Sequence, residues 1–411
     1  MSETVEKPEQ TGMIAKAKDF VTTIPYNKIG MKELLGYEKT PRNQLVALLT
    51  LIMLSMLVIG VITYFMEGHH AYNVSKEHPW GLLLAVYIFF VVSSTGLCII
   101  GSLGDVFGFK DYMLISKRAI FGSIVTILAG FAVISVEIGH PVTMLIYNVL
   151  TPGLSSAIWW MGTLYGAYLV FMIIEFVFLL KGDMKWAKRF GLSGLLVGLA
   201  AHSNLGSVFG FLNARPIANG VFYPTYFILT AFITGVFIAF IIMGFRYKLE
   251  FPEKVKTMLN GLAKIQALLL SILIFFVTWK MFTDIYGGMP NRSEVAIHIL
   301  GSWTFWAEVV LAMLIPLFLI LKDMGKSPVV LFWASLSGMV GIFFMRYNLV
   351  HDTQLKPLQM MKLKEYQAVP EWIHYFPSGT EMMISLGGLG LCIAMYYAGT
   401  KFFNLDEDEN H

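Results

Sequence analysis

The 411-residue sequence has few charged residues and almost no cysteine. Asp, Glu, Lys and Arg make up 14% of it, whereas about 25% is usual in soluble domains. The formal net charge of +3 is too small to indicate nucleic-acid binding. The two cysteines, Cys98 and Cys392, lie far apart in apolar runs. Such placement fits neither a disulfide framework nor a thiolate-bound iron–sulfur cluster.

The sequence also lacks the motifs of several enzyme classes. It has no Walker loop, no dinucleotide fingerprint after a strand, no HExxH zinc motif and no visible nucleophile with its base. Of its nine histidines only His202 lies deep in an apolar run, so two stacked bis-histidine haems are excluded, while one haem near a membrane face stays open. The first 43 residues lack a short apolar core, and we expect no cleavable signal peptide.

Long apolar runs dominate what is present. Hydrophobic residues make up 56% of the chain and the mean hydropathy is +0.66. Ten runs are long enough to cross a bilayer of about 30 Å as helices, whereas β-barrel strands would be shorter and alternating. We therefore predict an all-α polytopic membrane protein. The predicted spans are 44–65, 80–104, 119–138, 157–180, 190–211, 221–246, 265–285, 299–321, 328–349 and 378–403.

The basic residues of the short loops predict the orientation. Fourteen Lys and Arg lie in the loops 105–118, 181–190, 246–264 and 322–327, and six in the loops 66–79, 139–156, 212–220, 285–300 and 347–377. Because cytoplasmic loops carry the excess of Lys and Arg, we expect both termini in the cytoplasm of a bacterial inner membrane. The predicted parts are a cytoplasmic segment 1–43, a membrane domain 44–403 and an acidic cytoplasmic tail 404–411.

Polar motifs collect at the predicted outer ends of the spans. They are HPWG at 78–81, GHP at 139–141, NARP at 213–216, MRYN at 345–348, Asp284 and His298. The inner ends carry mostly Lys and Arg anchors instead. A set of His, Glu, Asn, Trp and single Arg residues on one face indicates a functional site rather than residues that anchor the helices in the membrane.

Four titratable groups lie inside the spans, where charge is expensive and usually functional. Glu175, His202 and Glu308 lie deep, and Glu137 lies about one turn inside its span. The alternative for each is a polar residue hydrogen-bonded to a neighbouring helix. Glu137 and His140, at i and i+3, are expected to share a helix face, where one group can stabilise the other's charge or relay a proton to it.

This pattern suits a small apolar ligand that takes up or releases protons near the outer face. A quinone fits, because its ring needs an apolar, aromatic slot and its oxygens need donors such as Tyr, His or Arg. Carboxylates would then supply the proton route.

Several motifs resemble those of the NrfD/polysulfide-reductase family of membrane subunits. HPWGLLLAVYIFFVVSSTG at 78–96 resembles its first core helix, and EIGHP at 137–141 resembles its acidic DLGHP-like helix end. The stretch 201–235, with Ala214-Arg215-Pro216 and Pro224, and the pair Arg346 and Asn348 complete the resemblance, which covers 78–348. The chain differs in having Tyr87 where some members have histidine, and Glu137 in place of aspartate.

The resemblance implies a core of two four-helix bundles with two additional helices. Members with ten helices occur in the quinone reductase complex, alternative complex III and sulfur-metabolism complexes, usually without a prosthetic group. The resemblance further implies that a quinone, expected to be menaquinone, binds beneath a docked ferredoxin-like iron–sulfur subunit on the periplasmic side. A molybdopterin-type subunit or a multihaem cytochrome c often lies beyond that iron–sulfur subunit. We accordingly expect no haem and no iron–sulfur cluster in this chain.

We therefore hypothesise that the chain is the quinone-interacting subunit of a respiratory oxidoreductase and that it has a quinone pocket near the outer face. Glu137 and His140 are predicted to exchange the quinone protons. The residues predicted to line or support the pocket are Tyr87, Trp80, His202, Arg215 and Asn213, and those predicted to extend a proton path are Glu175, Glu308 and Asp284. Trp80 also suits an interfacial anchor.

Two other interpretations stay open at this point. Gly-rich helices with intramembrane carboxylates also suit a secondary transporter, although the polar cluster lies near one face and no inverted repeat is evident. The third is a structural anchor with a degenerate quinone site. The outer loop 350–377 mixes basic, aromatic and Met residues, which favours a docking surface over a connector.

Overall fold

The structure is a computed structural model that describes residues 23–29, 33, 40–215, 217–289, 291–323, 325–357 and 371–406. Most of the predicted cytoplasmic segment 1–43, the centre of the loop 350–377 and the end of the acidic tail lie outside the described residues. The described chain is helical, and ten of its helices are long and apolar enough to cross a membrane. The predicted all-α polytopic class is therefore confirmed.

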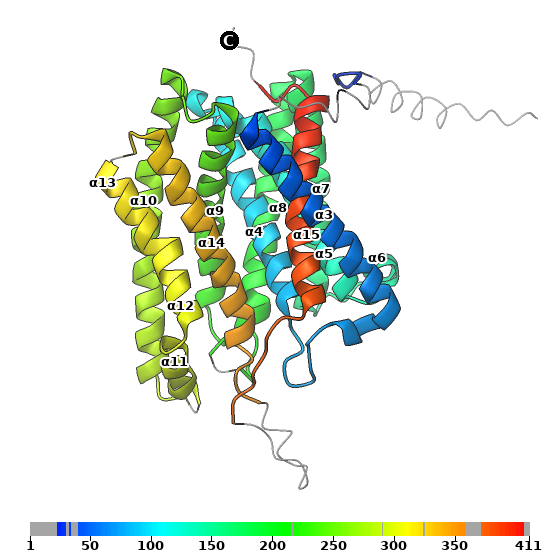
Figure 1. Ribbon diagram of the computed structural model, residues 1–411, viewed down its shortest axis with the longest axis vertical. Coiled ribbons are helices and arrows are strands. Elements are labelled where there is room, and N and C mark those ends of the chain that lie inside the picture. The colour runs from blue at the N-terminus through cyan, green and yellow to red at the C-terminus, as the bar shows by residue number, and fades with distance from the viewer. Residues whose placement is uncertain are drawn as a thin grey trace, which may run out of the picture.

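Spans that follow one another in the chain run in opposite directions along the long axis of the molecule (Figure 1). They are α3 (Pro41–Glu67), α4 (Leu82–Asp105), α5 (Met113–Glu137), α7 (Ala157–Lys181), α8 (Met184–Gly210), α9 (Phe222–Arg246), α10 (Glu253–Tyr286), the broken helix Trp303–Asp323, α14 (Pro328–Asp352) and α15 (Gly379–Phe402). Serine side chains cap several helix starts; Ser156, Ser327 and Ser378 each accept a backbone N–H of the first turn.

Eight of the spans form two four-helix bundles, as the resemblance implied. The first contains α4, α5, α7 and α8, and the second contains α9, α10, the broken helix and α14. Helix α9 packs against α4 and α8 and joins the two bundles. At this joint Gly96 and Gly235 bring their backbones into direct contact, so a Cβ on either would overlap the other helix.

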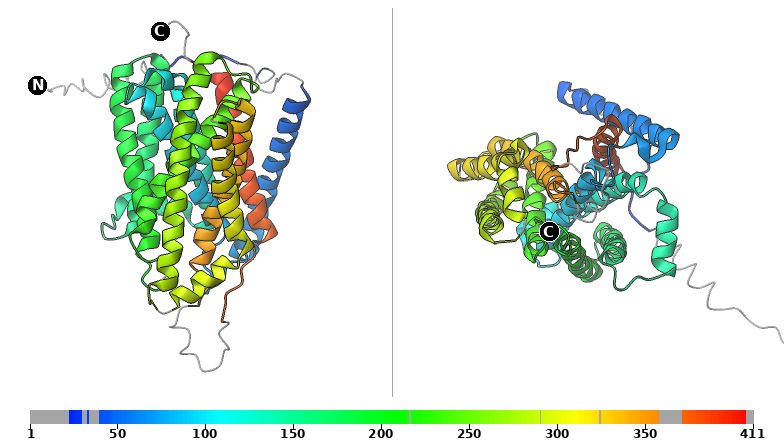
Figure 2. Two further views of the ribbon diagram at one scale, coloured as in Figure 1. Left: turned by 90° about the vertical axis from the view of Figure 1, so that its left-hand side faces the viewer. Right: turned by 90° about the horizontal axis from the view of Figure 1, so that it is seen from below.

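The two additional helices, α3 and α15, pair with each other on the side of the first bundle. Helix α15 packs against α5 and α4, while α3 contacts chiefly α15 and buries only Gly60 among its residues. Figure 2 shows α3 (blue) at the margin of the molecule. Its exposed apolar surface is what a helix facing lipid presents.

The eighth span is broken by a turn of π-helix. It consists of α12 (Trp303–Glu308), the π turn Val309–Leu314 and α13 (Ile315–Asp323). Ser337 of α14 donates to the carbonyl of Leu311 at 3.1 Å, and Gly341 lies against the backbone of Ala312. The close approach of α14 thus accompanies the wider turn, which begins directly after Glu308.

Three features differ from the sequence prediction. Helix α10 begins at Glu253 rather than near 265, because Val255, Met258 and Leu262 give its polar first turns a buried face. Two short helices, α6 (Pro141–Leu150) and α11 (Arg292–Leu300), occupy predicted loops. Seen from below, α6 (teal) lies beside the spans rather than among them (Figure 2).

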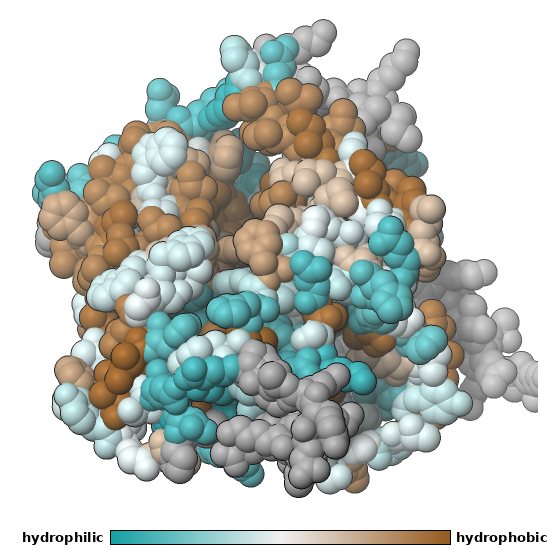
Figure 3. Space-filling view, turned by 60° about the horizontal axis from the view of Figure 1, so that its bottom comes forward, coloured by the Kyte–Doolittle hydropathy of each residue, from teal (hydrophilic) through white to brown (hydrophobic). Residues whose placement is uncertain are grey.

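The molecule has two unlike ends. We call the end where α3 begins and α15 ends the terminal face, and the opposite end, where α4, α7, α9 and α15 begin, the distal face. Asn27 donates its backbone N–H to the carbonyl of Phe402 at 2.8 Å, which holds the two terminal segments together on one face. Figure 3 shows hydrophilic side chains gathered toward the distal end, with apolar ones on the flanks.

Candidate functional site

Polar side chains from both bundles form one buried layer beneath the distal face. Each lies four to eight residues from the distal end of its helix, which is about 6–12 Å deep at 1.5 Å per residue. All are buried. The members of this polar layer are Tyr87, Tyr165, His202, Tyr226, Thr230, Glu308, Arg346 and Asn348.

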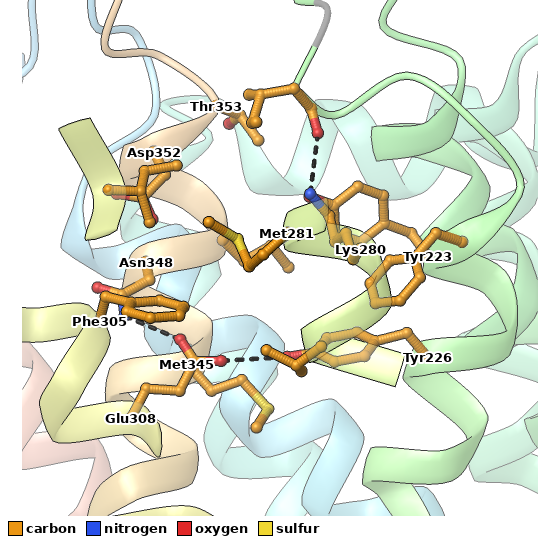
Figure 4. Close-up of a pocket in the computed structure, with 15 residues that line it drawn as sticks. Tyr223, Tyr226, Lys280, Met281, Phe305, Glu308, Met345, Asn348, Asp352 and Thr353 are labelled. Atoms are coloured by element: carbon orange, nitrogen blue, oxygen red, sulfur yellow. Dashed lines mark hydrogen bonds between the residues drawn. The ribbon is translucent and has the colours of Figure 1, made fainter. Parts of the chain in front are cut away.

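Glu308 is the carboxyl group of the layer. Asn348 donates its Nδ2 to Glu308 Oε2 at 2.9 Å, and the Tyr226 hydroxyl donates to Glu308 Oε1 at 3.4 Å (Figure 4). Asn348 also donates to the carbonyl of Thr304 at 3.1 Å, which fixes the amide on the distal turn of α12. Because neutral donors hold both oxygens, this carboxyl can bind or release a proton without losing a salt bridge.

Arg346 is the cation of the layer and is fully buried. Its Nη2 donates to Thr230 Oγ1 at 2.6 Å, and its guanidinium lies 4.9 Å from the ring centre of Phe227. Among the described residues its Nε and Nη1 have no hydrogen-bond partner. A buried arginine with spare hydrogen-bond donors is costly to keep, and a charged residue kept inside a membrane segment is usually functional.

The first bundle contributes His202 and two tyrosines. The Nδ1 of His202 lies 3.0 Å from the Tyr165 hydroxyl, and Nε2 has no partner among the described side chains. The imidazole meets the ring of Phe227 edge-on at 6.2 Å. Phe227 thus touches both His202 and Arg346 and joins the two halves of the layer. Tyr87 is buried nearby and stacks on Phe131 at 6.5 Å.

A cavity of about 70 Å³ adjoins Glu308 in the second bundle. Tyr223, Asn348 and Asp352 line it together with Lys280 (Figure 4). A water molecule occupies about 30 Å³ of liquid, so the cavity has room for two waters beside the carboxyl. It is too small for a quinone ring.

Lys280 closes the distal side of this cavity. Its Nζ donates to Asp284 and, at 3.4 Å, to the carbonyl of Ile217. Asp284 is fully buried and also pairs with Arg292, whose Nη2 lies 2.6 Å from its Oδ1. Asp284, which the sequence suggested for a proton path, is thus held by two cations.

The expectation that Glu137 and His140 share a helix face is wrong. Helix α5 ends at Glu137, Gly139 has a φ of +75°, and His140 precedes α6. The positive φ turns the chain, so His140 lies exposed off the helix while Glu137 stays half-buried. Instead, the ring of His69 packs against Gly139. Glu137 Oε2 is buried without a hydrogen-bond partner among the described residues.

Trp80, Asn213 and Arg215 lie at the distal surface and hold loops. Arg215 donates to the carbonyls of Lys356 at 2.6 Å and Glu77 at 3.4 Å, and burial lowers its pKa. The backbone of Trp80 exchanges two hydrogen bonds with Gln354, of 3.0 and 2.9 Å. Asn213 is exposed and accepts from Asn219 at 2.6 Å. None of the three lines the cavity.

Glu175 lies far from the layer, in the terminal half of the first bundle. Its buried carboxyl neighbours that of Asp105, a partner that the sequence analysis missed. Toward the layer, the Tyr168 hydroxyl lies 2.6 Å from Ser123 Oγ and 3.2 Å from Ser94 Oγ. The first bundle therefore carries polar groups at two depths.

Glu381 was also missed, although it organises the distal loops. It is fully buried at the start of α15 and accepts the backbone N–H groups of Asn73, Leu82 and Ser378 and the hydroxyl of Tyr375. The capping pattern Ser378–Glu381 was the signal in the sequence.

A histidine pair lies beside this carboxylate. His78 stacks on Tyr375 at 4.3 Å, and its Nε2 lies 3.2 Å from Nδ1 of His351. Burial, and next the neighbouring His351, lower the pKa of His78 to about 4. This histidine is therefore neutral at physiological pH.

Comparison with known proteins identifies the family. Residues 69–357 match the family described as polysulphide reductase, NrfD. The "Hdr-like menaquinol oxidoreductase integral membrane subunit" of Archaeoglobus fulgidus is 24% identical over 381 residues, which cover 87% of this chain and 93% of that protein. One selenate reductase subunit, from Mesobacillus selenatarsenatis, is 21% identical over 387 residues, which cover 82% of this chain and 89% of that protein. Since the family match spans more than half of the sequence, the chain belongs to the NrfD polysulphide reductase family.

Proposed function

We propose that this chain is the quinone-interacting membrane subunit of a multisubunit respiratory oxidoreductase. The polar layer carries the proposal, because it gathers an unpaired carboxyl, an imidazole and phenols beneath one face of a helical membrane protein. Reduction of a quinone takes up two electrons and two protons, and oxidation of the quinol releases them. Buried groups that exchange protons are what such a reaction needs close by.

Glu308 is the first candidate for the proton exchange. Its carboxyl is held by Asn348 and Tyr226 and borders a cavity with room for water, so a proton can reach it and leave. Arg346, in the same layer, favours negative charge on its neighbours. His202 and Tyr87, which belong to the first bundle, are proposed to support the quinone headgroup.

Glu137 with His140 is the second candidate, first suggested by the sequence. The buried Oε2 of Glu137 has no partner among the described residues, and His140 is exposed three positions on. The turn at Gly139 lets the acid face inward while the imidazole meets water. In this arrangement Glu137 would exchange protons with the quinone and His140 with the distal solution.

Electrons are proposed to arrive or leave through an extrinsic subunit on the distal face. The two relatives are named as subunits of a menaquinol oxidoreductase and of a selenate reductase. A ferredoxin-like iron–sulfur subunit, accompanied by a molybdopterin-type subunit or a multihaem cytochrome c, would suit the hydrophilic distal face (Figure 3). Menaquinone is the proposed quinone.

The basic loops support a terminal face in the cytoplasm of the inner membrane and a distal face in the periplasm. Protons from the cytoplasm would then enter at Asp105 and Glu175 and pass Tyr168 toward His202. The transporter interpretation is less well supported, since it expects a site near the midplane and the polar layer lies near the distal ends of its helices.

Purification of the native complex tests this function. The preparation should contain redox-active subunits, and it should transfer electrons between them and a menaquinol analogue at a rate that quinone-site inhibitors abolish. A chain that purifies alone and catalyses substrate flux into vesicles would instead establish the transporter.

A further inference from the structure

A groove of about 390 Å³ lies between α9 and α10 on the outside of the second bundle. Phe222, Phe275, Phe276 and Trp279 form its apolar wall. Phe275 and Trp279 are 58% and 56% exposed, so the groove opens sideways, where lipid would be, rather than onto the distal face. Figure 1 shows α10 at the edge of the molecule. A membrane lipid can therefore reach the groove directly.

The groove has a charged end, formed by Lys280, Asp284 and Arg292. Lys280 lies six residues before the distal end of α10 at Tyr286, and Arg292 begins α11. At 1.5 Å per residue, Lys280 is thus about 9 Å below the distal end of α10. Trp279 and Tyr286 belong to the aromatic types that are enriched where a bilayer meets water. The charged end therefore lies at the depth of lipid headgroups.

Two cations share one carboxylate at this charged end. Asp284 accepts from Lys280 Nζ and, at 2.8 Å, from Arg292 Nε, while Arg292 Nη2 lies 2.6 Å from its Oδ1. One positive charge is left over, and an unmatched charge beside hydrocarbon is expensive. Because α11 begins at Arg292, the positive end of its dipole adds to the excess. The charged end therefore favours an anion.

The nearby carboxyl groups do not cancel this excess within the groove. Glu308 and Asp352 line the cavity on the other side of Lys280 and do not line the groove (Figure 4). Glu294, in the first turn of α11, is paired with Lys356 at 2.7 Å. Among the described residues, Asp284 is thus the single carboxylate that lines the groove.

Both cations keep N–H groups that can bind a phosphate. An ammonium group has three N–H donors and a guanidinium has five. In the described part of the chain Lys280 uses two, on Asp284 and on the carbonyl of Ile217. Arg292 uses three, of which two contact Asp284 and one contacts Met289 Sδ, a weak acceptor. A phosphate can therefore bind the remaining N–H groups without displacing Asp284.

We propose that this groove binds an anionic phospholipid of the distal leaflet. Its phosphate contacts Arg292 and Lys280, and one acyl chain lies along Phe275, Phe276 and Trp279. Basic pockets between transmembrane helices bind anionic lipid headgroups in the same way. A neutral ligand could cover the aromatic wall but would leave the excess positive charge unmatched.

The proposed lipid lies next to the polar layer without forming part of it. Phe222 and Lys280 line both the groove and the cavity beside Glu308, and Lys280 Nζ lies 5.7 Å from the ring centre of Phe222. One lysine and one phenyl ring thus separate the lipid from that cavity. The lipid site does not depend on the proposed function, since it rests on the groove and its charges alone.

Native mass spectrometry of the purified complex, stripped of lipid in detergent, tests the site. Phosphatidylglycerol should bind more tightly than phosphatidylcholine. Arg292→Gln should weaken phosphatidylglycerol binding about tenfold, which corresponds to about 1.4 kcal/mol of lost contact, and Arg292→Lys should restore part of it. Lys356→Gln is the matched control, because it removes the same charge near α11 while Lys356 lines neither groove nor cavity. Equal affinity for the two lipids, or equal loss in Arg292→Gln and Lys356→Gln, would overturn the proposal.

Photoaffinity labelling tests the location in the unmodified protein. A phosphatidylglycerol that carries a diazirine on its acyl chain should label peptides 222–225 and 275–284, and excess phosphatidylglycerol should compete this label away. Helix α3 buries only Gly60 and serves as the control for general lipid contact, so its label should resist competition. Groove label that resists competition as α3 label does would leave only general lipid contact and overturn the site. Groove label that excess menaquinone removes would give the groove to the quinone and overturn the lipid assignment.

Discussion

At the scale of single residues, the layer beneath the distal face combines one unpaired carboxyl with one unpaired guanidinium. Glu308 and Arg346 do not bond each other; they bond neutral partners, Asn348 and Thr230. Each charge therefore stays available to a third group. A structural ion pair would have joined them directly.

Replacement of Arg346 should separate function from folding. Arg346→Met removes a fully buried charge but keeps an apolar stem of similar length, so the complex should still assemble, because such exchanges are often neutral for stability. Quinone turnover should fall by at least tenfold through loss of the positive field. Arg346→Lys retains the charge and should recover part of the rate; a Met variant with full turnover would remove Arg346 from the reaction.

Glu381 should matter for stability alone. The carboxylate of Glu381 accepts hydrogen bonds from four residues, Asn73, Leu82, Ser378 and Tyr375. Glu381→Gln removes the charge and replaces one accepting oxygen with an NH2 group. A hydrogen bond to a charged group contributes about 1.5–3 kcal/mol to stability. The thermal unfolding midpoint in detergent should drop by several degrees. Glu371→Gln, at a side chain that is 76% exposed, is the control and should leave the midpoint unchanged.

The lowered pKa of His78 predicts an acid-sensitive distal face. The unfolded chain binds a proton there near pH 6.5, whereas the folded chain does so only near pH 4. The unfolded state thus binds more protons over that range, and the folded state loses stability as pH falls from about 6.5 to 4. The unfolding midpoint of His78→Gln should fall less than that of the wild type across this window; parallel curves would contradict the assignment.

At the scale of elements, the sequence predicted the spans well and their interruptions poorly. Ten long apolar runs leave few alternatives in a bilayer, so each predicted span overlaps an observed one. The ten-residue α6 is too short to be recognised as a span, and the π turn has no composition of its own. That turn depends on α14, whose Gly341 admits the backbone of Ala312.

Glycine substitutions should show that this contact holds the eighth span in place. Gly341→Ala drives a Cβ into the backbone of Leu311 and Ala312, so the unfolding midpoint should fall and the position of Glu308 should shift, lowering turnover. Gly166→Ala on α7 is the matched control: its Cβ meets nothing within 4 Å, and alanine favours a helix. Equal effects of the two substitutions would contradict the account.

The candidate site was predictable in part. His202 and Glu308 stood out because polar groups in apolar runs are conspicuous, and Tyr87 was pointed to by the resemblance to the family. The structure brings all three into one layer. Tyr165, Tyr226 and Thr230 were missed, since such residues are ordinary in membrane helices until their partners are known. Lys280 gave a usable signal, a lysine within an apolar run, that was overlooked.

At the scale of the whole molecule, the chain presents a hydrophilic distal end and apolar flanks (Figure 3). The layer of protonatable side chains is buried below that end. A redox partner would approach the distal end in water, whereas a quinone would approach from the flank in lipid. In the proposed function, the layer lies where these two routes would meet. Asn27 and Phe402, which are described residues near the two termini, lie at the other end of the molecule.

Accessibility labelling tests the proposed orientation. In a background in which Cys98 and Cys392 are replaced by alanine, Lys76→Cys on the distal face should react in intact cells with a maleimide that cannot cross the inner membrane. Lys185→Cys on the terminal face should react only after permeabilisation, and both positions are exposed. The reverse pattern would place the distal face in the cytoplasm.

The most direct test of the central claim is the quinone-dependent turnover of the purified complex carrying Glu308→Gln. This variant keeps the shape of the side chain: its amide oxygen can accept from Asn348, and its NH2 can donate to the Tyr226 hydroxyl. It cannot carry a proton. The account predicts a loss of at least tenfold in kcat with all subunits retained, and a partial recovery in Glu308→Asp. Full turnover in Glu308→Gln, with turnover abolished in Glu137→Gln instead, would contradict the account and move the proton exchange to the end of α5.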